Sequence, residues 1–192
     1  MMINLFATQI YKKSLVLDLS DIVKYCYDLK NNTSGRKVSN RNGWQSNNLS
    51  GSILPLNSMF IEILKAMNEY KEQVGAKGTV ELDNIWININ PKGGSNIPHV
   101  HPHSFMSGVY YVQTPNDCGN IYFENTHPVN YDWQDFKFKD FSNNVNAGDT
   151  WEFEPKENDL YIFPSWAKHG VNANTSNTDR ISISFNGQLT NC

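Results

Sequence analysis

The sequence predicts a mainly β protein: a jelly-roll-like barrel with helices packed against its outside. Three observations support this fold class. The chain has 192 residues, a length that suits one domain with a core of its own. Two segments of the N-terminal part carry apolar residues at helical spacing. Beyond Gly75, apolar and polar residues alternate in many short segments, which is the pattern of half-buried strands.

The two predicted helices lie in the N-terminal part of the chain. The first covers residues 18–29, where apolar residues stand three or four positions apart behind a possible cap at Asp18 or Ser20. The second covers residues 58–74, and Gly75 is well placed to end it. Both patterns have one apolar face, so we expect both helices to pack against the barrel.

The clearest predicted strand covers residues 84–90. Its three isoleucines alternate with Trp86, Asn88 and Asn90, so one face is apolar and the other is polar. Further strands are expected at residues 106–113, 119–124, 149–154, 159–163 and 180–186. Many short strands after two helices favour a jelly-roll barrel, and the mouth of such a barrel is where a small-ligand site is expected.

The whole chain, residues 1–192, is predicted to form a single domain. Residues 1–78 supply the helices and an N-terminal strand at Ile3–Ile10, which could pair with the barrel or with a second subunit. Residues 32–54 are rich in Asn, Ser and Gly, so we expect loops there. Residues 79–188 form the barrel core. The sequence does not indicate an oligomeric state.

The composition narrows the class of protein. Hydrophobic residues make up 39% and charged residues 18%, so the chain is globular. The net charge of −3 gives no field to hold nucleic acid by phosphate contacts alone, so a nucleic-acid partner is not expected. The three cysteines have no CxxC spacing and are expected to be reduced thiols. With no apolar run long enough to span a bilayer, we expect a soluble cytoplasmic protein.

The histidines give the first sign of chemistry. His99 and His101 stand two residues apart, so on an extended segment their side chains point to the same side. A third ligand must come from a distant strand, and His169 suits that place. Three ligands that leave positions open suit an iron centre that binds a cosubstrate and oxygen. His103 is not expected to bind the metal directly, and His127 is expected to lie in a loop. The alternative is a surface cluster of histidines.

Arg180 opens a second informative segment. In the run 180–185, Ser182 and Ser184 share a face with Arg180, and the apolar residues share the other. An arginine that points into a barrel is costly unless it meets an anion, and its planar fork matches a carboxylate. Arg180 follows His169 by eleven residues, enough for a turn and re-entry on the adjacent strand. The alternative is a structural salt bridge with one of the acidic residues.

Three segments together resemble the 2-oxoglutarate- and iron(II)-dependent oxygenase superfamily, and within it a branch often found in bacteria and phages. These segments are the run Asn90–Val112 with Pro98-His99-Val100-His101-Pro102-His103, the run Asp159–Trp166 that leads to His169, and the run Arg180–Asn186. They fall in the order expected for the superfamily, whose pattern is His-x-Asp/Glu, a distal His, and then an Arg or Lys. The resemblance covers roughly residues 79–188.

This chain departs from that pattern at one position. His101 stands where a carboxylate is expected, which leaves the iron site one negative charge short. Relatives among the aspartyl/asparaginyl hydroxylases also lack that carboxylate and still work. The resemblance implies a double-stranded β-helix, with iron(II) bound by His99, His101 and His169. The implied cosubstrates are 2-oxoglutarate and O2.

The same resemblance implies a set of residues for the carboxylates of 2-oxoglutarate. Arg180, with Ser182, is expected to hold the far carboxylate, and Asn88 and one tyrosine are expected beside them. Tyr110 and Tyr111 are neighbours in a strand, so only one can face inward. We favour Tyr110.

The implied reaction is hydroxylation with release of succinate and CO2. A peptidyl or amino-acid side chain is the favoured substrate; a nucleobase would also suit the scaffold. Residues 127–148 are long, polar and aromatic, and we predict a lid or substrate-recognition loop there. Trp86, Phe105, Trp151 and Trp166 are expected to line a dry pocket.

Three other readings stay open. A cupin-like enzyme with three histidine ligands would use the same histidines without 2-oxoglutarate, and would have no need of Arg180. A non-catalytic jelly-roll binding module would make the histidines incidental. A zinc hydrolase would need a carboxylate near the histidines as general base, and Glu124 is the nearest in sequence.

Overall fold

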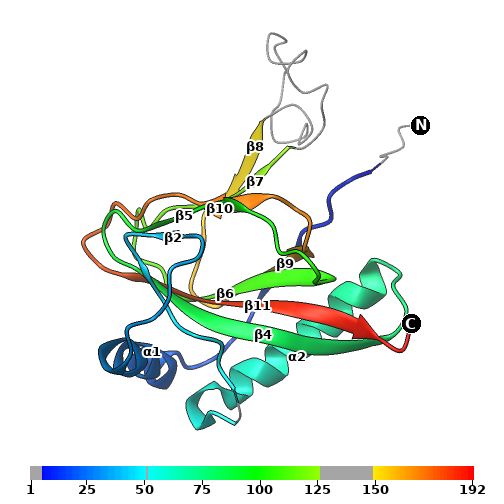
Figure 1. Ribbon diagram of the computed structural model, residues 1–192, viewed down its shortest axis with the longest axis horizontal. Helices are drawn as coiled ribbons and strands as arrows, with labels where there is room; N and C mark the ends of the chain where they lie inside the picture. The colour runs from blue at the N-terminus through cyan, green and yellow to red at the C-terminus, as the bar shows by residue number, and fades with distance from the viewer. Residues whose placement is uncertain (1–5, 51, 126–148) are drawn as a thin grey trace.

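The computed structural model describes residues 6–50, 52–125 and 149–192, and it shows two β-sheets that face each other (Figure 1). The larger sheet has the strand order β1-β9-β6-β11-β4-β3, and the smaller sheet has the order β2-β5-β10-β7-β8. Helices α1 and α2 lie on the outer face of the larger sheet, and the smaller sheet lies across from its inner face. This is the double-stranded β-helix with helices outside that the sequence predicts. The predicted lid, residues 127–148, lies outside the described residues.

The elements follow one another along the chain as follows: β1 (Tyr11–Ser14), α1 (Ser20–Asn32), β2 (Asn40–Arg41), β3 (Trp44–Gln45), a 3-10 helix (Leu54–Leu56), α2 (Asn57–Gln73), β4 (Thr79–Asn90), β5 (Ser95–His99), β6 (Met106–Gln113), β7 (Ile121–Glu124), β8 (Thr150–Phe153), β9 (Asp159–Pro164), β10 (His169–Val171) and β11 (Arg180–Thr190).

The two helices form where the apolar spacing predicts them. Helix α2 buries its apolar stripe, which includes Ile63, Ala66 and Met67, and it contacts β4 and β9. Gly75 follows with φ +71°, a left-handed conformation in which glycine avoids the strain of a side chain. None of the described helices is long and apolar enough to cross a membrane.

The six predicted strands are all present, and the strand at Met106–Gln113 has the predicted bounds. Several short strands were not predicted. The predicted loop region 32–54 contains β2 and β3, and β5 and β10 carry His99 and His169. The N-terminal strand lies at Tyr11–Ser14, after the predicted segment, and pairs with β9 at the edge of the larger sheet. Strands of two to five residues are too short for an alternation of apolar and polar residues that would distinguish their sequence from that of a loop.

Strand β11 separates the core from the interior of the barrel. It pairs with β4 on one side and β6 on the other, so it is central in the larger sheet. Its apolar side chains, Ile181, Ile183 and Phe185, lie in the core shared with the helices. Arg180 and Ser182, on the opposite face, line a cavity between the two sheets. The predicted alternation of this strand is therefore confirmed.

Gly108 allows β6 and β11 to pack closely. Gly108 pairs with Phe185 across the two strands, and a Cβ atom on Gly108 would lie 2.3 Å from a ring carbon of Phe185. We therefore expect Gly108→Ala to overpack this region and to lower the free energy of unfolding by about 1–3 kcal/mol. Urea-induced unfolding measures this change. An unchanged unfolding midpoint would contradict the close contact.

Candidate metal centre and cosubstrate pocket

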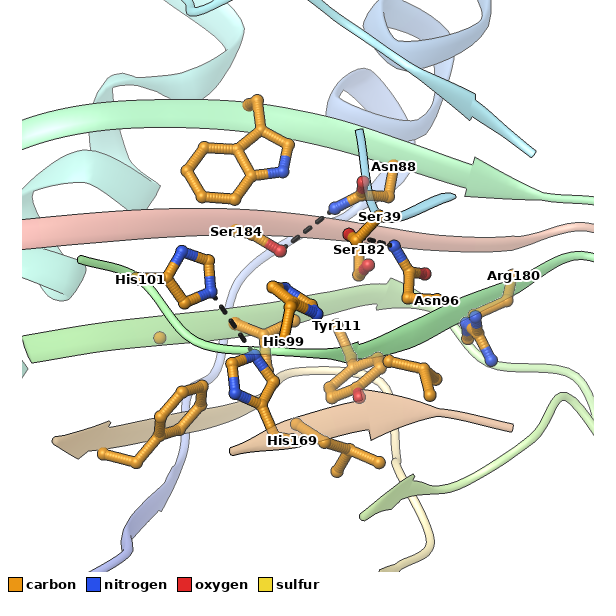
Figure 2. Close-up of a pocket in the computed structure, with 16 residues that line it drawn as sticks. Ser39, Asn88, Asn96, His99, His101, Tyr111, His169, Arg180, Ser182 and Ser184 are labelled. Carbon is orange, nitrogen blue, oxygen red and sulfur yellow. Dashed lines mark hydrogen bonds between the residues drawn. The ribbon is translucent and has the colours of Figure 1, made fainter. Parts of the chain in front are cut away.

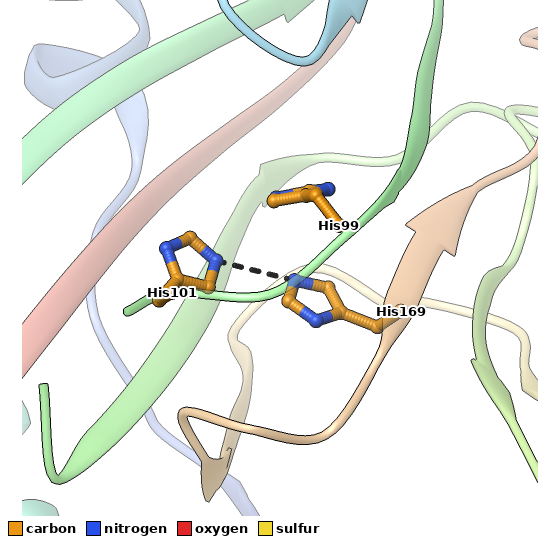
Figure 3. Close-up of side chains that lie close together, drawn as sticks. All are labelled: His99, His101 and His169. Carbon is orange, nitrogen blue, oxygen red and sulfur yellow. Dashed lines mark hydrogen bonds between the residues drawn. The ribbon is translucent and has the colours of Figure 1, made fainter. Parts of the chain in front are cut away.

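The three histidines predicted as metal ligands meet at the smaller sheet (Figure 3). His99 ends β5 and is the direct antiparallel partner of His169, which begins β10. His101 follows β5 by two residues, and its backbone N–H donates to the carbonyl of Ser165 (2.9 Å), which fixes this segment near β10. One nitrogen from each of the three rings lies within 4.8 Å of the others.

The geometry of the three imidazoles fits a single metal ion. The Nε2 atoms of His101 and His169 are 3.4 Å apart. Two nitrogens bonded to one ion at about 2.1 Å are separated by about 3.0–3.5 Å for bond angles of about 90–110°. The Nδ1 atoms of His99 and His169 donate to the carbonyls of Ile97 (2.7 Å) and Ala167 (2.9 Å). These bonds place the ring proton on Nδ1. They leave the unprotonated Nε2 of each ring available to bind a metal.

Burial keeps the three imidazoles neutral, as metal ligands must be. Desolvation, with the neighbouring His99, lowers the pKa of His101 to about 4. Desolvation, again with His99, lowers the pKa of His169 to about 3. Desolvation also lowers the pKa of His99, although its hydrogen bond to Ile97 opposes the shift. The site therefore offers three uncharged nitrogen donors near neutral pH.

The other two histidines do not join this group. His103 is exposed, has the left-handed φ of +69°, and does not line the cavity. This agrees with the expectation that His103 does not bind the metal directly. His127 lies outside the described residues.

A cavity between the sheets connects the histidines with Arg180 (Figure 2). The space in it that is open to water-sized molecules is about 40 Å³. The lining residues are Ser39, Trp86, Asn88, Asn96, His99, His101, Gly108, Val109, Tyr111, Ile121, Phe163, His169, Val171, Arg180, Ser182 and Ser184. Predicted site residues Asn88, Ser182 and Arg180 are thus brought to one cavity with the three histidines. Within the described part of the chain, no aspartate or glutamate lines it.

Arg180 is buried at one end of this cavity. Its exposed fraction is 1%, and its Nη1 donates to the backbone carbonyls of Cys118, Gly119 and Asn172. Among the described residues it forms no ion pair with a carboxylate, so the alternative of a structural salt bridge finds no support there. Carbonyl dipoles orient the guanidinium but leave its charge uncompensated, which favours an anionic ligand.

The prediction that Tyr110 faces the site is wrong, because the pairing of β6 with β11 turns Tyr111 inward instead. Tyr110 lies opposite Ile183 and shares its outward face, and its Oη donates to Asn158 Oδ1 (2.6 Å). Tyr111 lies opposite Ser182, on the inward face, and lines the cavity. Its Oη is buried and has no hydrogen-bond partner among the described residues. This hydroxyl is therefore available to a molecule bound in the cavity.

Of the four aromatic residues expected around the pocket, Trp86 lines it. Its ring centroid lies 5.9 Å from that of His101. Trp166 is 57% exposed and Phe105 packs at the edge of the helical core, so both were placed wrongly. Trp151 lies half-buried on β8 and does not line the cavity either.

The lining residues that the sequence analysis missed include Ser39, Asn96, Gly108, Val109, Ile121, Phe163 and Val171. Ser39 lies in a region predicted as loop, and Asn96 lies on the short strand β5. Asn96 Nδ2 donates to Ser39 Oγ (3.2 Å) across this wall of the cavity. The position of Asn96, an odd number of residues before His99, gives no sign of this, because β5 is irregular opposite β10.

The comparison with protein families now decides the class. A family model described as "Putative 2OG-Fe(II) oxygenase" matches residues 84–186, more than half of the chain. The chain belongs to this 2-oxoglutarate/iron(II) oxygenase family. The match spans the three histidines and Arg180, so the site lies within the part that defines the family. A comparison with curated protein sequences gave no match.

Solved structures of other oxygenases share the fold. A prolyl-4-hydroxylase from Pseudomonas putida has a TM-score of 0.65 at 12% identity, covering 94% of this chain and 92% of that one. A prolyl hydroxylase from Trichoplax adhaerens, in complex with a hypoxia-inducible-factor peptide fragment, has a TM-score of 0.67 at 12% identity, covering 94% and 83%. A viral collagen prolyl hydroxylase from Paramecium bursaria Chlorella virus-1, as its 2OG complex, has a TM-score of 0.62 at 10% identity, covering 94% and 96%.

Proposed function

We propose that this 2-oxoglutarate/iron(II) oxygenase hydroxylates a peptidyl or amino-acid side chain and releases succinate and CO2. One observation carries the proposal: a buried guanidinium without a carboxylate partner among the described residues shares a cavity with three neutral imidazoles. Three ligands leave room at an iron ion for further ligands. Bound iron(II) supplies the activation of O2 that the side chains alone cannot perform.

His99, His101 and His169 would hold the iron. The hydrogen bonds from Nδ1 of His99 and His169 orient two of these rings before the metal binds. His101 instead stacks near His169, with ring centroids 5.2 Å apart. Its Nε2 is the atom that faces the shared centre.

Arg180, Ser182 and Tyr111 would bind 2-oxoglutarate. Arg180 and Ser182 point to the same side of β11, and Tyr111 is the cross-strand partner of Ser182. These three supply a guanidinium and two hydroxyl donors, which a carboxylate can accept. Asn88 Nδ2 donates one of its two hydrogens to Ser184 Oγ (3.0 Å), so its second N–H could serve the predicted role beside the cosubstrate.

Tyr111 provides a test of this assignment. We expect Tyr111→Phe to weaken 2-oxoglutarate binding about tenfold, because one hydrogen bond to a charged group is lost. Calorimetric titration of the metal-loaded protein under anaerobic conditions measures the affinity. Tyr110→Phe is the matched control, since its hydroxyl bonds Asn158 on the other face of the strand. Equal weakening in the two variants would contradict the placement of Tyr111.

The proposed substrate class is supported by two features. The cavity has neutral amide and hydroxyl groups on one wall, which suits hydrogen bonding to an amide or amino-acid group. Proteins with the same fold include prolyl hydroxylases, one of them solved with a peptide fragment. The net charge of −3 weighs against a polynucleotide.

One assay distinguishes the proposed oxygenase from the cupin-like and the non-catalytic readings. The purified protein is supplied with iron(II), 2-oxoglutarate and O2, and succinate is quantified with and without candidate peptides. Iron-dependent succinate supports the proposal. Absence of succinate, together with absence of 2-oxoglutarate binding, would favour the cupin-like or the non-catalytic reading. The zinc-hydrolase reading lacks a base among the described residues, since Glu124 pairs with Lys168 and does not line the cavity.

A further inference from the structure

The cavity has a second end, away from Arg180. Arg180 and Ser184 point to the same side of β11 four residues apart, which separates their Cα atoms by about 13 Å. Ser184 pairs with Trp86, and the Trp86 ring lies beside His101. Figure 2 shows Arg180 at one side of the group and His101 and Ser184 at the other. A cosubstrate held by Arg180 and the metal leaves this second end free for another molecule.

The charges in the cavity do not balance when the metal and 2-oxoglutarate are bound. A divalent ion and Arg180 carry three positive charges, and 2-oxoglutarate carries two negative charges. The three histidine ligands are neutral, and within the described residues no acidic side chain lines the cavity. The described residues therefore leave one positive charge uncompensated in a buried site, which is costly unless a further anion binds.

The wall at the second end offers donors to such an anion. Ser184 Oγ accepts from Asn88 Nδ2 (3.0 Å), so its own hydroxyl hydrogen is free to donate. A hydroxyl that already accepts a hydrogen bond is a stronger donor, because the two bonds polarise each other. Asn88 is 5% exposed, and its Oδ1 has no partner among the described residues. That oxygen needs an N–H or O–H donor, which the 2-oxoglutarate dianion does not carry.

We propose that this second end, formed by His101, Trp86 and Ser184 and bordered by Asn88 opposite Ser182, binds a carboxylate-bearing primary substrate. Ser184 donates to the carboxylate, and Asn88 Oδ1 accepts from an adjacent N–H or O–H of the same substrate. The carboxylate compensates the charge that remains because His101 is neutral. This inference rests on the proposed function. It narrows the substrate class to amino-acid or peptide derivatives that carry a free carboxylate.

The test uses two small probes of nearly equal shape on the full-length protein loaded with cobalt(II) and 2-oxoglutarate. N-acetylglycine carries a carboxylate and an N–H group, and N-acetylglycinamide replaces the carboxylate with a neutral amide. Binding is followed by the visible spectrum of the cobalt ion and by calorimetry. We expect the acid to bind at least tenfold more tightly than the amide.

Two aspartate variants separate the charge effect from other causes. His101→Asp supplies the missing negative charge, and its carboxylate can itself bind the metal, so we expect the preference for the acid to disappear while cobalt stays bound. His103→Asp makes the same change at an exposed position that does not line the cavity, so we expect the preference to persist.

Equal binding of the two probes, no binding of the acid, or a preference that survives His101→Asp would overturn the inference. The affinity for 2-oxoglutarate is measured before the probes are added. The proposed function and the substrate assignment can therefore fail separately. Absence of an acid preference in the wild-type protein, with 2-oxoglutarate still bound, overturns only the substrate assignment. Failure of the wild-type protein to bind 2-oxoglutarate overturns the proposed function as well.

Discussion

Replacing His169 with alanine is expected to abolish iron-dependent succinate formation. His169 is the most enclosed of the three imidazoles, with 5% of its surface exposed, and its Nε2 lies 3.4 Å from that of His101. Loss of a residue that only orients a metal ligand costs about 10–100-fold in affinity or activity, so loss of the ligand itself should cost more than about 100-fold. Metal content after dialysis and succinate yield measure the effect.

His103→Ala is the matched control for this variant. It removes the same side chain from an exposed position that does not line the cavity. We expect it to keep wild-type metal content and succinate yield. Circular dichroism and the unfolding midpoint establish that each variant is folded. Full succinate formation by folded His169→Ala would exclude the three-histidine iron centre.

Replacing Arg180 is expected to remove 2-oxoglutarate binding while the metal stays bound. The guanidinium is buried, it lies on a different strand from the histidines, and it compensates no described carboxylate. Truncating one partner of a buried charge pair costs about 2–5 kcal/mol. We therefore expect Arg180→Met to weaken 2-oxoglutarate binding at least about 30-fold. Calorimetry on the metal-loaded protein measures the affinity.

Arg180→Lys keeps the charge and loses the planar fork. It should restore part of the affinity, because a lysine binds a carboxylate as a point charge without the bidentate geometry. Arg180 also donates to the carbonyls of Cys118, Gly119 and Asn172, so the unfolding midpoint of each variant must be measured. A folded Arg180→Met with full activity would favour the cupin-like enzyme that uses no 2-oxoglutarate.

Much of the fold is contained in the local sequence pattern. The isoleucines of β4 and β11 alternate with polar residues over long segments, and the apolar stripe of α2 has helical spacing. Such repeats indicate both the element and its buried face, because each face needs one kind of side chain. The short strands β2, β3 and β10 carry no such repeat, and their existence depends on the partners they pair with.

The candidate site, like the fold, was predictable in part from the local sequence and in part only from tertiary contacts. The spacing of His99 and His101, the distal His169, and the position of Arg180 at the start of an alternating strand were all readable from the chain. The choice between Tyr110 and Tyr111 could not be made from the chain, because the two residues are adjacent and both are tyrosines. Cross-strand register decides it: Tyr111 faces Ser182, and Tyr110 faces Ile183.

The sequence by itself thus determined the class of barrel, the two helices and the residue types of a metal and carboxylate site. Only the tertiary structure decided that Tyr111 lines the cavity, and that Arg180 meets backbone carbonyls among the described residues. It also shows that Asn88, which lies opposite Ser182, donates to Ser184 Oγ in the cavity wall. The physical reason is the distance along the chain between the interacting residues. The alternation of apolar and polar residues is a property of neighbouring residues, whereas strand register and charge compensation depend on segments that meet only after folding.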